Sequence, residues 1–489
     1  MTAPQFQDRH LGVDQSAEAL MLEALGVSSL DELMDQAVPG HLRQEDIASV
    51  IPEPATEAEV LQELRALAEA NTVRRSMLGR GYYGTHTPSV ITRNVLQNPS
   101  WYTAYTPYQP EIAQGRLEAL LNFQTMVGDL TGLPVSNASM LDEATAVAEA
   151  MLLARRASQS DSQVFLVDAD LLPQTKAVLA ARAEPVGIEL VETDFQGDLP
   201  AAFGAALQYP GASGRVWNPE KVLGALHDRG ALTVVAADLL SLTLLTPPGD
   251  MGADIAVGTT QRFGIPMGFG GPHAGYLAVR QGLERQMPGR LVGVSQDRFG
   301  NPAYRLTLQT REQHIRRDRA TSNICTAQVL LAVMAGLFAV YHGPEGLRRM
   351  ATDIASQAAG FAEALRQAGL EVVHEHFFDT VQVRVPGQAD HYVARAAENN
   401  LLITRVDDDT VQLSCDQTTA EASARGVGSG VFGALSATFG LTNYRGDKTT
   451  SPALPTELER VSDFLGHPVF NVHRSETQMM RYLKSLADK

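Results

Sequence analysis

Short apolar segments that alternate with helical segments between residues 139 and 275 constrain the fold of this chain more than any other feature. A parallel sheet is covered by helices on both faces, so its strands are continuously apolar rather than alternating. The segments of this kind are 164–167, 188–191 and 232–236, with helices predicted at 174–182 and 220–228. This order predicts an α/β domain with a mostly parallel sheet.

Composition divides the 489 residues into four predicted regions. They are a helical N-terminal segment (1–75), a large α/β domain (76–335), a small C-terminal α+β domain (336–445) and a C-terminal extension (446–489). The large domain opens with a Gly-, Tyr- and Pro-rich loop at 76–111, where so many breakers exclude a regular element. In the small domain we predict a long helix from about residue 344 and a hairpin that turns at 407–409.

Charge and cysteine content exclude several classes of protein. The chain has 39 Lys and Arg against 56 Asp and Glu, a net charge of −17, so it lacks the basic excess that neutralises nucleic-acid phosphates. Its first residues do not resemble a secretory signal, and no apolar run approaches the ~20 residues that cross a bilayer. Since it has only two cysteines, Cys325 and Cys415, we expect a cytoplasmic protein without disulfides.

The residues that follow two neighbouring strands have the layout of a pyridoxal 5'-phosphate (PLP) enzyme. Asp238 follows one strand, and the next strand ends in the turn Thr260-Gln261-Arg262. In PLP enzymes the aspartate holds the pyridinium nitrogen, and a lysine after the later strand forms the Schiff base. Neither glutamine nor arginine forms an imine. The sequence therefore predicts a degenerate PLP site without a covalent cofactor.

Lysine is scarce, which limits every mechanism that needs a lysine nucleophile. The five lysines are Lys176, Lys221, Lys448, Lys484 and Lys489. The first two lie on predicted helices, and the other three lie beyond residue 440. A self-sufficient PLP enzyme is therefore disfavoured.

One helix N-terminus in the same domain bears on phosphate binding. We predict a capping box at Ser139-Met-Leu-Asp142, which opens a helix. Free N–H groups and the dipole of such an end favour an anion. Asp142 and Glu143 already place carboxylates there, which opposes a phosphate. Ordinary capping and a lost phosphate site both predict that no phosphate binds.

Two further patterns favour structural roles. The glycine-rich run at 264–275 has His273 where the dinucleotide fingerprint needs a glycine, so a tightly packed loop is favoured over a nucleotide site. His374 and His376 fall on one face of a predicted strand, but no third ligand is near them in sequence. We therefore predict no metal site.

Two polar loops keep more than one interpretation. Residues 102–111 gather three tyrosines and a glutamate between prolines, which suits a binding mouth and a structural arm equally well. Residues 314–319 form a basic cluster that is more typical of a solvated face than of an anion site. Polar residues at 321–325 follow directly, so an anion site stays open as the alternative interpretation.

Long motifs give the chain a resemblance to a known family. They are 77–88 (MLGRGYYGTHTP), 101–126, 141–145 (LDEAT), 261–264 (QRFG), 269–273 (FGGPH) and 320–326 (ATSNICT). In these motifs the chain resembles the P-protein of the glycine cleavage system, glycine dehydrogenase (decarboxylating), in its amino-terminal half. That family joins two homologous halves of the aspartate aminotransferase fold (PLP fold type I), fused or as separate subunits. Residues 470–484 resemble the join between halves, so we expect a fragment of a fused protein.

The resemblance implies a function. In the family, glycine condensed with PLP loses CO2, and its aminomethyl group passes to the lipoyl arm of the H-protein. The second half carries the Schiff-base lysine and PLP, so the isolated chain is expected to be inactive and to form a homodimer. The residues expected to reach a shared active site are Tyr105, Tyr108, Glu111, Asn323 and Cys325, beside a degenerate site of Asp238, Gln261 and His273.

An alternative from a different class stays open. The chain would then be a non-catalytic subunit that stabilises the partner half and docks the H-protein without touching the chemistry. Mutation of Tyr108 or Glu111 separates the two hypotheses. Loss of turnover with assembly intact favours a shared site, and unchanged turnover with weaker assembly favours a docking subunit.

Overall fold

The computed structural model describes residues 10, 12–43, 52, 54–103, 106–309, 313–320, 322, 324, 328–424, 429–442, 444, 446, 449 and 452–489. The chain divides into two compact units, Met1–Val73 and Arg74–Lys489. The predicted subdivision of the second unit at residues 335 and 445 stays a prediction.

Three helices make up most of the described part of the first unit: α2 (Gln15–Leu25), α3 (Leu30–Ala37) and α4 (Glu57–Glu69). Each begins after a side chain that accepts a hydrogen bond from its first turn, namely Asp14, Ser29 and Thr56. These helices confirm the helical prediction, but none of their residues is buried.

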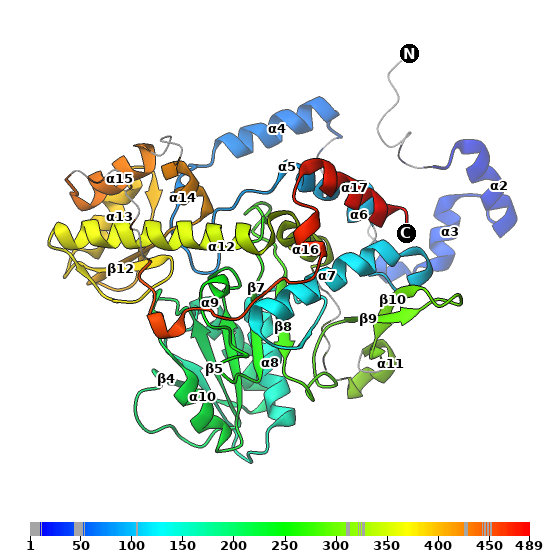
Figure 1. The fold of residues 1–489 in the computed structure, drawn as a ribbon. Helices are drawn as coiled ribbons and strands as arrows, with labels where there is room; N and C mark the ends of the chain where they lie inside the picture. The colour runs from blue at the N-terminus through cyan, green and yellow to red at the C-terminus, as the bar shows by residue number, and fades with distance from the viewer. Residues whose placement is uncertain are drawn as a thin grey trace. The chain divides into compact units, whose positions relative to one another are not determined.

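A seven-stranded sheet forms the centre of the second unit (Figure 1). Its strands, in the order β2-β8-β7-β6-β5-β3-β4, are β2 (Val135–Ser136), β8 (Gly275–Val279), β7 (Ile255–Thr259), β6 (Leu232–Ala237), β5 (Gly204–Tyr209), β3 (Val164–Asp168) and β4 (Glu189–Thr193). The run from β7 to β4 is parallel, and β8 is antiparallel to both its neighbours. The predicted strands are confirmed as β3, β4 and β6, whereas β5 and β8 fall outside them.

Helices cover both faces of this sheet, as the apolar strands predict. One face packs on α8 (Glu143–Ala157) and α9 (Pro173–Ala183), and the other on α7 (Gln114–Thr131), α10 (Glu220–His227) and α12 (Val329–Gln367). Alternate strand residues serve the two faces, because Phe165 and Val167 join the core under α8 while Leu166 joins the core under α7. The sheet and these helices are called the large lobe below.

A second, antiparallel sheet forms the small lobe. Its order is β11-β12-β15-β14, with β11 (Glu371–Val372), β12 (Thr380–Arg384), β15 (Thr410–Ser414) and β14 (Thr404–Arg405), and with helices α13 (Ala389–Glu398), α14 (Gln417–Ala424) and α15 (Ser429–Phe439). The hairpin between β14 and β15 turns at 406–409, close to the predicted turn. His374 and His376 follow β11 instead of lying on a strand, so the prediction that they share a strand face is wrong.

The described residues of 76–111 begin beside the small lobe and, after a first short strand, form short helical turns. β1 (Arg75–Ser76) pairs with β13 (Leu401–Leu402), and the turns are α5 (Ser89–Ile91), η3 (Thr92–Leu96), α6 (Pro99–Tyr102) and η4 (Pro110–Ile112). The loop prediction for 76–111 is therefore right in character, apart from these single turns.

The basic cluster at 314–319 lies on α11 (Gln313–Arg316) and η8 (Arg317–Arg319), where the described side chains are exposed.

α12 starts earlier than the helix predicted from residue 344. It bends at Gly343, which has φ 64° and ψ 178°, and Pro344 resumes the helix. By length and composition this helix could cross a membrane, contrary to the expectation that no apolar run is long enough. However, 67% of its most apolar window is buried within the protein, as in the core helix of a globular domain.

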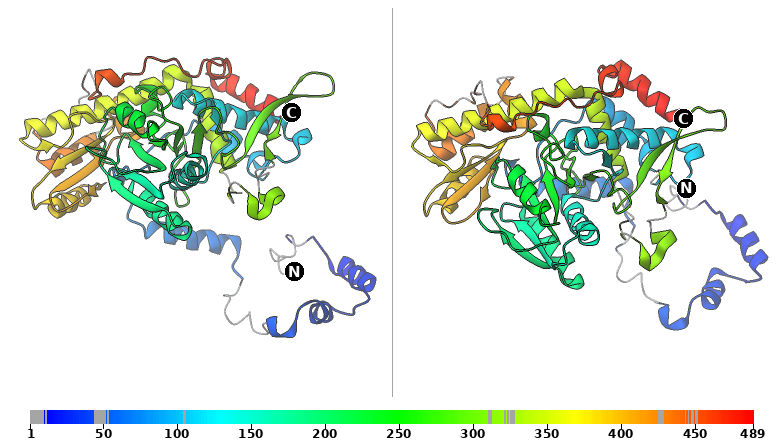
Figure 2. Two further views of the ribbon diagram at one scale, coloured as in Figure 1. Left: turned by 90° about the horizontal axis from the view of Figure 1, so that it is seen from below. Right: turned by 60° about the horizontal axis from the view of Figure 1, so that its bottom comes forward.

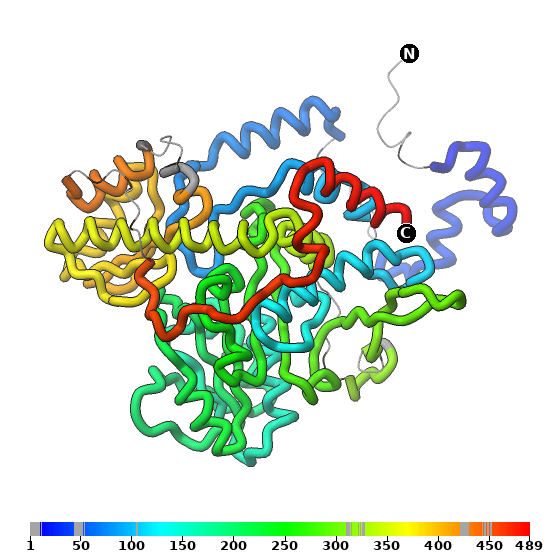
Figure 3. Tube along the Cα trace, in the orientation of Figure 1, coloured from blue at the N-terminus to red at the C-terminus, as the bar shows by residue number. Residues whose placement is uncertain are grey.

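The C-terminal segment runs from the small lobe back along the large lobe to α7 (Figure 3). It contains α16 (Val469–Val472) and α17 (Glu476–Ala487). Arg460, 7% exposed, donates hydrogen bonds to the carbonyl oxygens of Leu130 and Asp129 at the end of α7. On α17, the hydroxyl of Tyr482 accepts a hydrogen bond of 2.7 Å from Asn122 of α7. These contacts attach the segment to the core.

A hairpin of β9 (Leu291–Gln296) and β10 (Pro302–Thr307) lies outside the main sheet and projects from the large lobe (Figure 2). Two glutamines of α7 hold it. Gln124 hydrogen-bonds both backbone groups of Val292 at 2.8 and 3.2 Å, and Gln114 does the same for Tyr304 at 2.8 Å. No sequence pattern predicts this hairpin.

Candidate active site

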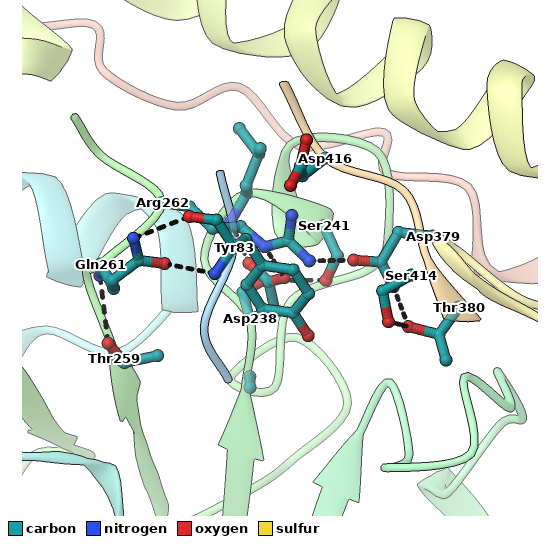
Figure 4. Close-up of polar contacts among 12 residues, drawn as sticks. Tyr83, Asp238, Ser241, Thr259, Gln261, Arg262, Asp379, Thr380, Ser414 and Asp416 are labelled. Carbon is teal, nitrogen blue, oxygen red and sulfur yellow. Dashed lines mark hydrogen bonds and ion pairs between the residues drawn. The ribbon is translucent and has the colours of Figure 1, made fainter. Parts of the chain in front are cut away.

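Polar side chains gather where the parallel strands end. Asp238 follows β6, the turn with Gln261 and Arg262 follows β7, and Asp168 ends β3. The carboxyl ends of parallel strands share one edge of the sheet, which is where α/β proteins place their ligand sites. Figure 4 shows this edge, with Asp379 and Ser414 of the small lobe facing it. Asp238 and the turn after β7 meet at this edge, where Asp238 forms an ion pair with Arg262.

Gln261, at the position predicted for the Schiff-base lysine, is bound to backbone on two sides. Its Nε2 donates to the carbonyl oxygens of Tyr83 at 2.9 Å and Ile265 at 2.7 Å, and its Oε1 accepts from the Tyr83 N–H at 2.9 Å. The residue is 1% exposed. The amide thus fixes the backbone of the 76–111 loop against the large lobe.

The described lysines lie elsewhere. Lys176, on α9, donates to the carbonyl oxygen of Ala169 at 2.6 Å and pairs with Glu192. Lys221 is on α10, Lys484 and Lys489 belong to the C-terminal segment, and Lys448 is outside the described residues. None of the described lysines lines the cavity at the strand ends.

Arg262 carries the positive charge of the site. Its Nε is 2.5 Å from an oxygen of Asp238, and a terminal nitrogen donates to Asp379. Its guanidinium carbon lies 3.2 Å from the centre of the Tyr83 ring. Burial lowers the pKa of Arg262, but the nearby carboxylates Asp238 and Asp379 outweigh burial and raise it above its usual value. Burial raises the pKa of Asp379.

The helix that faces this site, α8, is capped by Asp142. The carboxylate of Asp142 accepts a hydrogen bond of 2.7 Å from the Thr145 N–H, so the predicted capping box with Ser139 as its first residue is wrong. Ser139 has φ 125° and lies before the cap. The next residue, Met140, forms an isolated antiparallel β-bridge with Gly275. The prediction that carboxylates occupy this helix end is confirmed for Asp142, whose side chain caps α8.

Glu143, the first residue of α8, is a buried carboxyl group beside Asp238. It is 8% exposed, and it accepts a hydrogen bond of 3.4 Å from the Gln208 amide. Burial raises the pKa of Glu143 to about 7, with further contributions from Asp238 and Asp142. The raised pKa favours the neutral, protonated form of this buried carboxyl group.

Replacement of Glu143 by glutamine should stabilise the protein at alkaline pH. Because the folded pKa of Glu143 is raised, the unfolded state loses this proton first, and the stability of the wild type falls as pH rises from about 4.5 to about 7. Glu143→Gln removes that loss, so its free energy of unfolding at pH 8 should exceed the wild type by up to about 3 kcal/mol. Denaturant midpoints at pH 5 and pH 8 measure this.

The matched control is Glu189→Gln, an exposed carboxyl group on β4. Its midpoint should follow the wild type at both pH values. Equal stability of Glu143→Gln and the wild type at pH 8 would contradict the raised pKa.

The cavity enclosed by these residues is small. It has a volume of about 40 Å³, lies between the two lobes and is lined by Arg80, Tyr83, Glu143, Gln208, Asp238, Thr259, Arg262, Asp379 and Thr380, among others. That is room for roughly three water molecules, whereas ligand pockets hold about 300 Å³ or more.

PLP does not fit these residues. The lysine position is a glutamine bound to backbone, the aspartate for the pyridinium is paired with Arg262, and Asp142 and Glu143 occupy the helix end that would hold the phosphate. Among the described residues no group of three His, Cys, Asp or Glu side chains could hold a metal ion. The strand edge of this chain is therefore filled by its own side chains.

The other predicted site residues lie away from this cavity or outside the described residues. His273 bonds the carbonyl oxygen of Gly271 at 3.0 Å and meets the Tyr82 ring edge-on, in a glycine-rich loop that is tightly folded as predicted. Tyr108 is 48% exposed, and its hydroxyl accepts a hydrogen bond of 2.6 Å from buried Arg290. Glu111 is exposed on η4. Tyr105, Asn323 and Cys325 lie outside the described residues.

Sequence reasoning missed several members of the strand-end cluster, among them Tyr83, Asp168, Asp379 and Glu143 as a titrating group. Asp379 precedes β12 in the small lobe, and only the folded chain brings it to Arg262. Tyr83 carried a signal, since it stands in one of the long motifs. Glu143 was assigned to the helix end, but its burial could not be foreseen from that position.

The chain is similar to known proteins along most of its length. A family model described as glycine cleavage system P-protein matches residues 8–427. A crystal structure of glycine decarboxylase (P-protein) of the glycine cleavage system, in inhibitor-bound form, is 35% identical with a TM-score of 0.80, over 88% of this chain and 99% of that chain.

More distant structures share only the fold. An alanine–glyoxylate aminotransferase from Nostoc sp. is 14% identical with a TM-score of 0.51, over 81% of this chain and 100% of that chain. A NifS-like protein is 12% identical with a TM-score of 0.51, over 75% and 98%. The fold is that of the PLP-dependent aminotransferases of fold type I, which confirms the predicted fold class.

Proposed function

Because this chain belongs to the glycine cleavage system P-protein family, we propose that it is the lysine-free half of a glycine decarboxylase and completes the active site of a PLP-bearing partner half. The observation that carries the proposal is Gln261, whose amide is bound to the backbone of Tyr83 and Ile265 at the position where the fold needs a lysine. The family and the fold imply PLP, and this chain offers no described lysine at the strand ends.

In the proposed enzyme, PLP on the partner half supplies the electron sink for decarboxylation of glycine. The residues of this chain orient the reacting groups and exclude water. Tyr108, fixed by Arg290 at 2.6 Å, is an exposed aromatic group on a proline-bounded loop and suits the wall of a shared site. The lipoyl arm of an H-protein would accept the aminomethyl group at the same place.

Reconstitution tests the proposal. The isolated chain should catalyse no glycine-dependent exchange of labelled CO2 in the presence of PLP and lipoylated H-protein. Addition of the partner half should raise the exchange rate by about 100-fold or more over either half alone, because the positioning groups come from both. A partner variant whose Schiff-base lysine is replaced by arginine is the matched control and should restore assembly without exchange.

Two results would overturn the proposal. Exchange by the isolated chain at the rate of the mixture would make it a complete enzyme. Full exchange by the partner half alone would show that this chain does not contribute to the active site. Light scattering on the same samples checks the expected homodimer of the isolated chain and its replacement by a complex with the partner half.

A further inference from the structure

The contacts of Arg262 join four segments that are far apart in sequence. Arg262 follows β7, Asp238 follows β6, Asp379 precedes β12, and Tyr83 lies in the 76–111 loop. The guanidinium pairs with both carboxylates and lies 3.2 Å from the centre of the Tyr83 ring. Arg262 is 6% exposed, so these contacts are largely shielded from bulk solvent.

The chemistry of these contacts matches what a PLP enzyme offers to its cofactor. There, a strand-end aspartate faces the pyridinium nitrogen, which belongs to a flat, delocalised cation. A guanidinium is also flat and delocalised, stays protonated at every physiological pH and stacks on aromatic rings. In this chain the flat cation is part of the polypeptide, and the strand-end Asp238 is paired with it.

The same contacts tie the two lobes together. Asp238 and Arg262 belong to the large lobe, and Asp379 belongs to the small lobe. The loop between Tyr83 and His86 is bound from both lobes: the Tyr83 N–H donates to Gln261, the Gly84 N–H donates to Asp416 at 2.7 Å, and the His86 N–H donates to Gln417 at 3.0 Å. These three amides therefore report whether the lobes are held closed on the loop.

We propose that Arg262 is a built-in replacement for the cofactor, which holds the two lobes closed on residues 83–86 and makes this chain a rigid, cofactor-independent body. A cofactor is exchangeable, whereas a side chain cannot leave. The inference concerns the isolated chain and does not depend on glycine, PLP or a partner half. Its failure would therefore leave the shared-site proposal as it stands.

Hydrogen exchange in Arg262→Ala tests the inference. Loss of the guanidinium leaves two carboxylates facing each other beside Glu143, so the lobes should part. The amides of Tyr83, Gly84 and His86 should then exchange about tenfold faster or more, with the amides of β6 changing less. Methylguanidinium at about 10 mM should restore their protection, because it supplies the missing flat cation. Methylammonium at the same concentration, which has the same charge but no plane, should not.

Two further variants keep the test decisive. Arg481→Ala removes an exposed arginine of α17 and should leave the exchange of residues 83–86 as in the wild type. Arg262→Lys keeps the charge and should fold even where Arg262→Ala does not, yet exchange faster at the three amides, since an ammonium cannot stack and reach both carboxylates. Wild-type exchange in Arg262→Lys, or equal rescue of Arg262→Ala by methylammonium, would overturn the inference.

Discussion

Replacement of Arg460 by alanine should lower the free energy of unfolding by about 3 to 5 kcal/mol. The side chain donates to the carbonyl oxygens of Leu130, Leu242 and Asp129 at 2.8 Å and to that of Ser462 at 3.0 Å. The carbonyls of Leu130 and Asp129 belong to the last turn of α7, where the helix dipole favours a cation. Without the guanidinium, buried carbonyl groups lose a donor, and the C-terminal segment loses one of its attachments to the large lobe.

Chemical denaturation followed by tryptophan fluorescence measures the Arg460→Ala effect. Burial lowers the pKa of Arg460 to about 10, so the side chain is charged throughout the neutral range and the effect should be the same at pH 6 and pH 8. Arg460→Lys should recover only part of the loss, because one ammonium cannot serve all four carbonyls. Arg481→Ala, an exposed arginine on α17, should change stability by less than about 0.5 kcal/mol. A denaturation midpoint of Arg460→Ala equal to that of the wild type would contradict this account of the C-terminal segment.

Replacement of Tyr108 by alanine should lower kcat/KM for glycine-dependent CO2 exchange of the reconstituted enzyme by about 10- to 100-fold, with the complex between the halves intact. The expected loss follows from the position of Tyr108 on the proposed wall, where Arg290 fixes the ring through a hydrogen bond and by stacking at 5.2 Å. Tyr108→Phe keeps the ring and should lose less activity than Tyr108→Ala.

Tyr102→Ala is the matched control, because Tyr102 is 50% exposed and lies near Tyr108 in sequence. It should leave kcat/KM within about twofold of the wild type. If Tyr108→Ala keeps full turnover but binds the partner half more weakly, the chain acts as a docking subunit instead, and the shared-site proposal is wrong at this residue.

The sequence predicted the parts of the fold that depend on local patterns. Continuous apolar runs predicted β3, β4 and β6, and the helical spacing predicted α9 and α10. α12 starts earlier than predicted because it continues through Gly343 and Pro344. A glycine with positive φ followed by a proline bends the helix here without ending it. The hairpin β9–β10 depends on Gln114 and Gln124 of α7, contacts that local spacing does not reveal.

The candidate site, too, could be predicted only in part from the sequence. Asp238 and the non-lysine turn after β7 could be found, since strand ends and missing residue types are visible in a sequence. The ion pair of Arg262 with Asp379 could not, because it joins two lobes. The cap of α8 was misplaced because Ser139 and Asp142 both match the pattern of a first residue, and only the backbone, with Ser139 at φ 125°, separates them.

We propose that none of the five lysines of this chain binds PLP, and labelling of the lysines with PLP can test this. The purified chain is mixed with excess PLP, its visible absorption spectrum is recorded, and borohydride reduction is followed by mass spectrometry of the peptides. The account predicts no Schiff-base absorption band and no lysine that is pyridoxylated stoichiometrically. Stoichiometric labelling of a single lysine would contradict it, since the chain would then be a complete PLP enzyme and Gln261 would not mark the vacant lysine position.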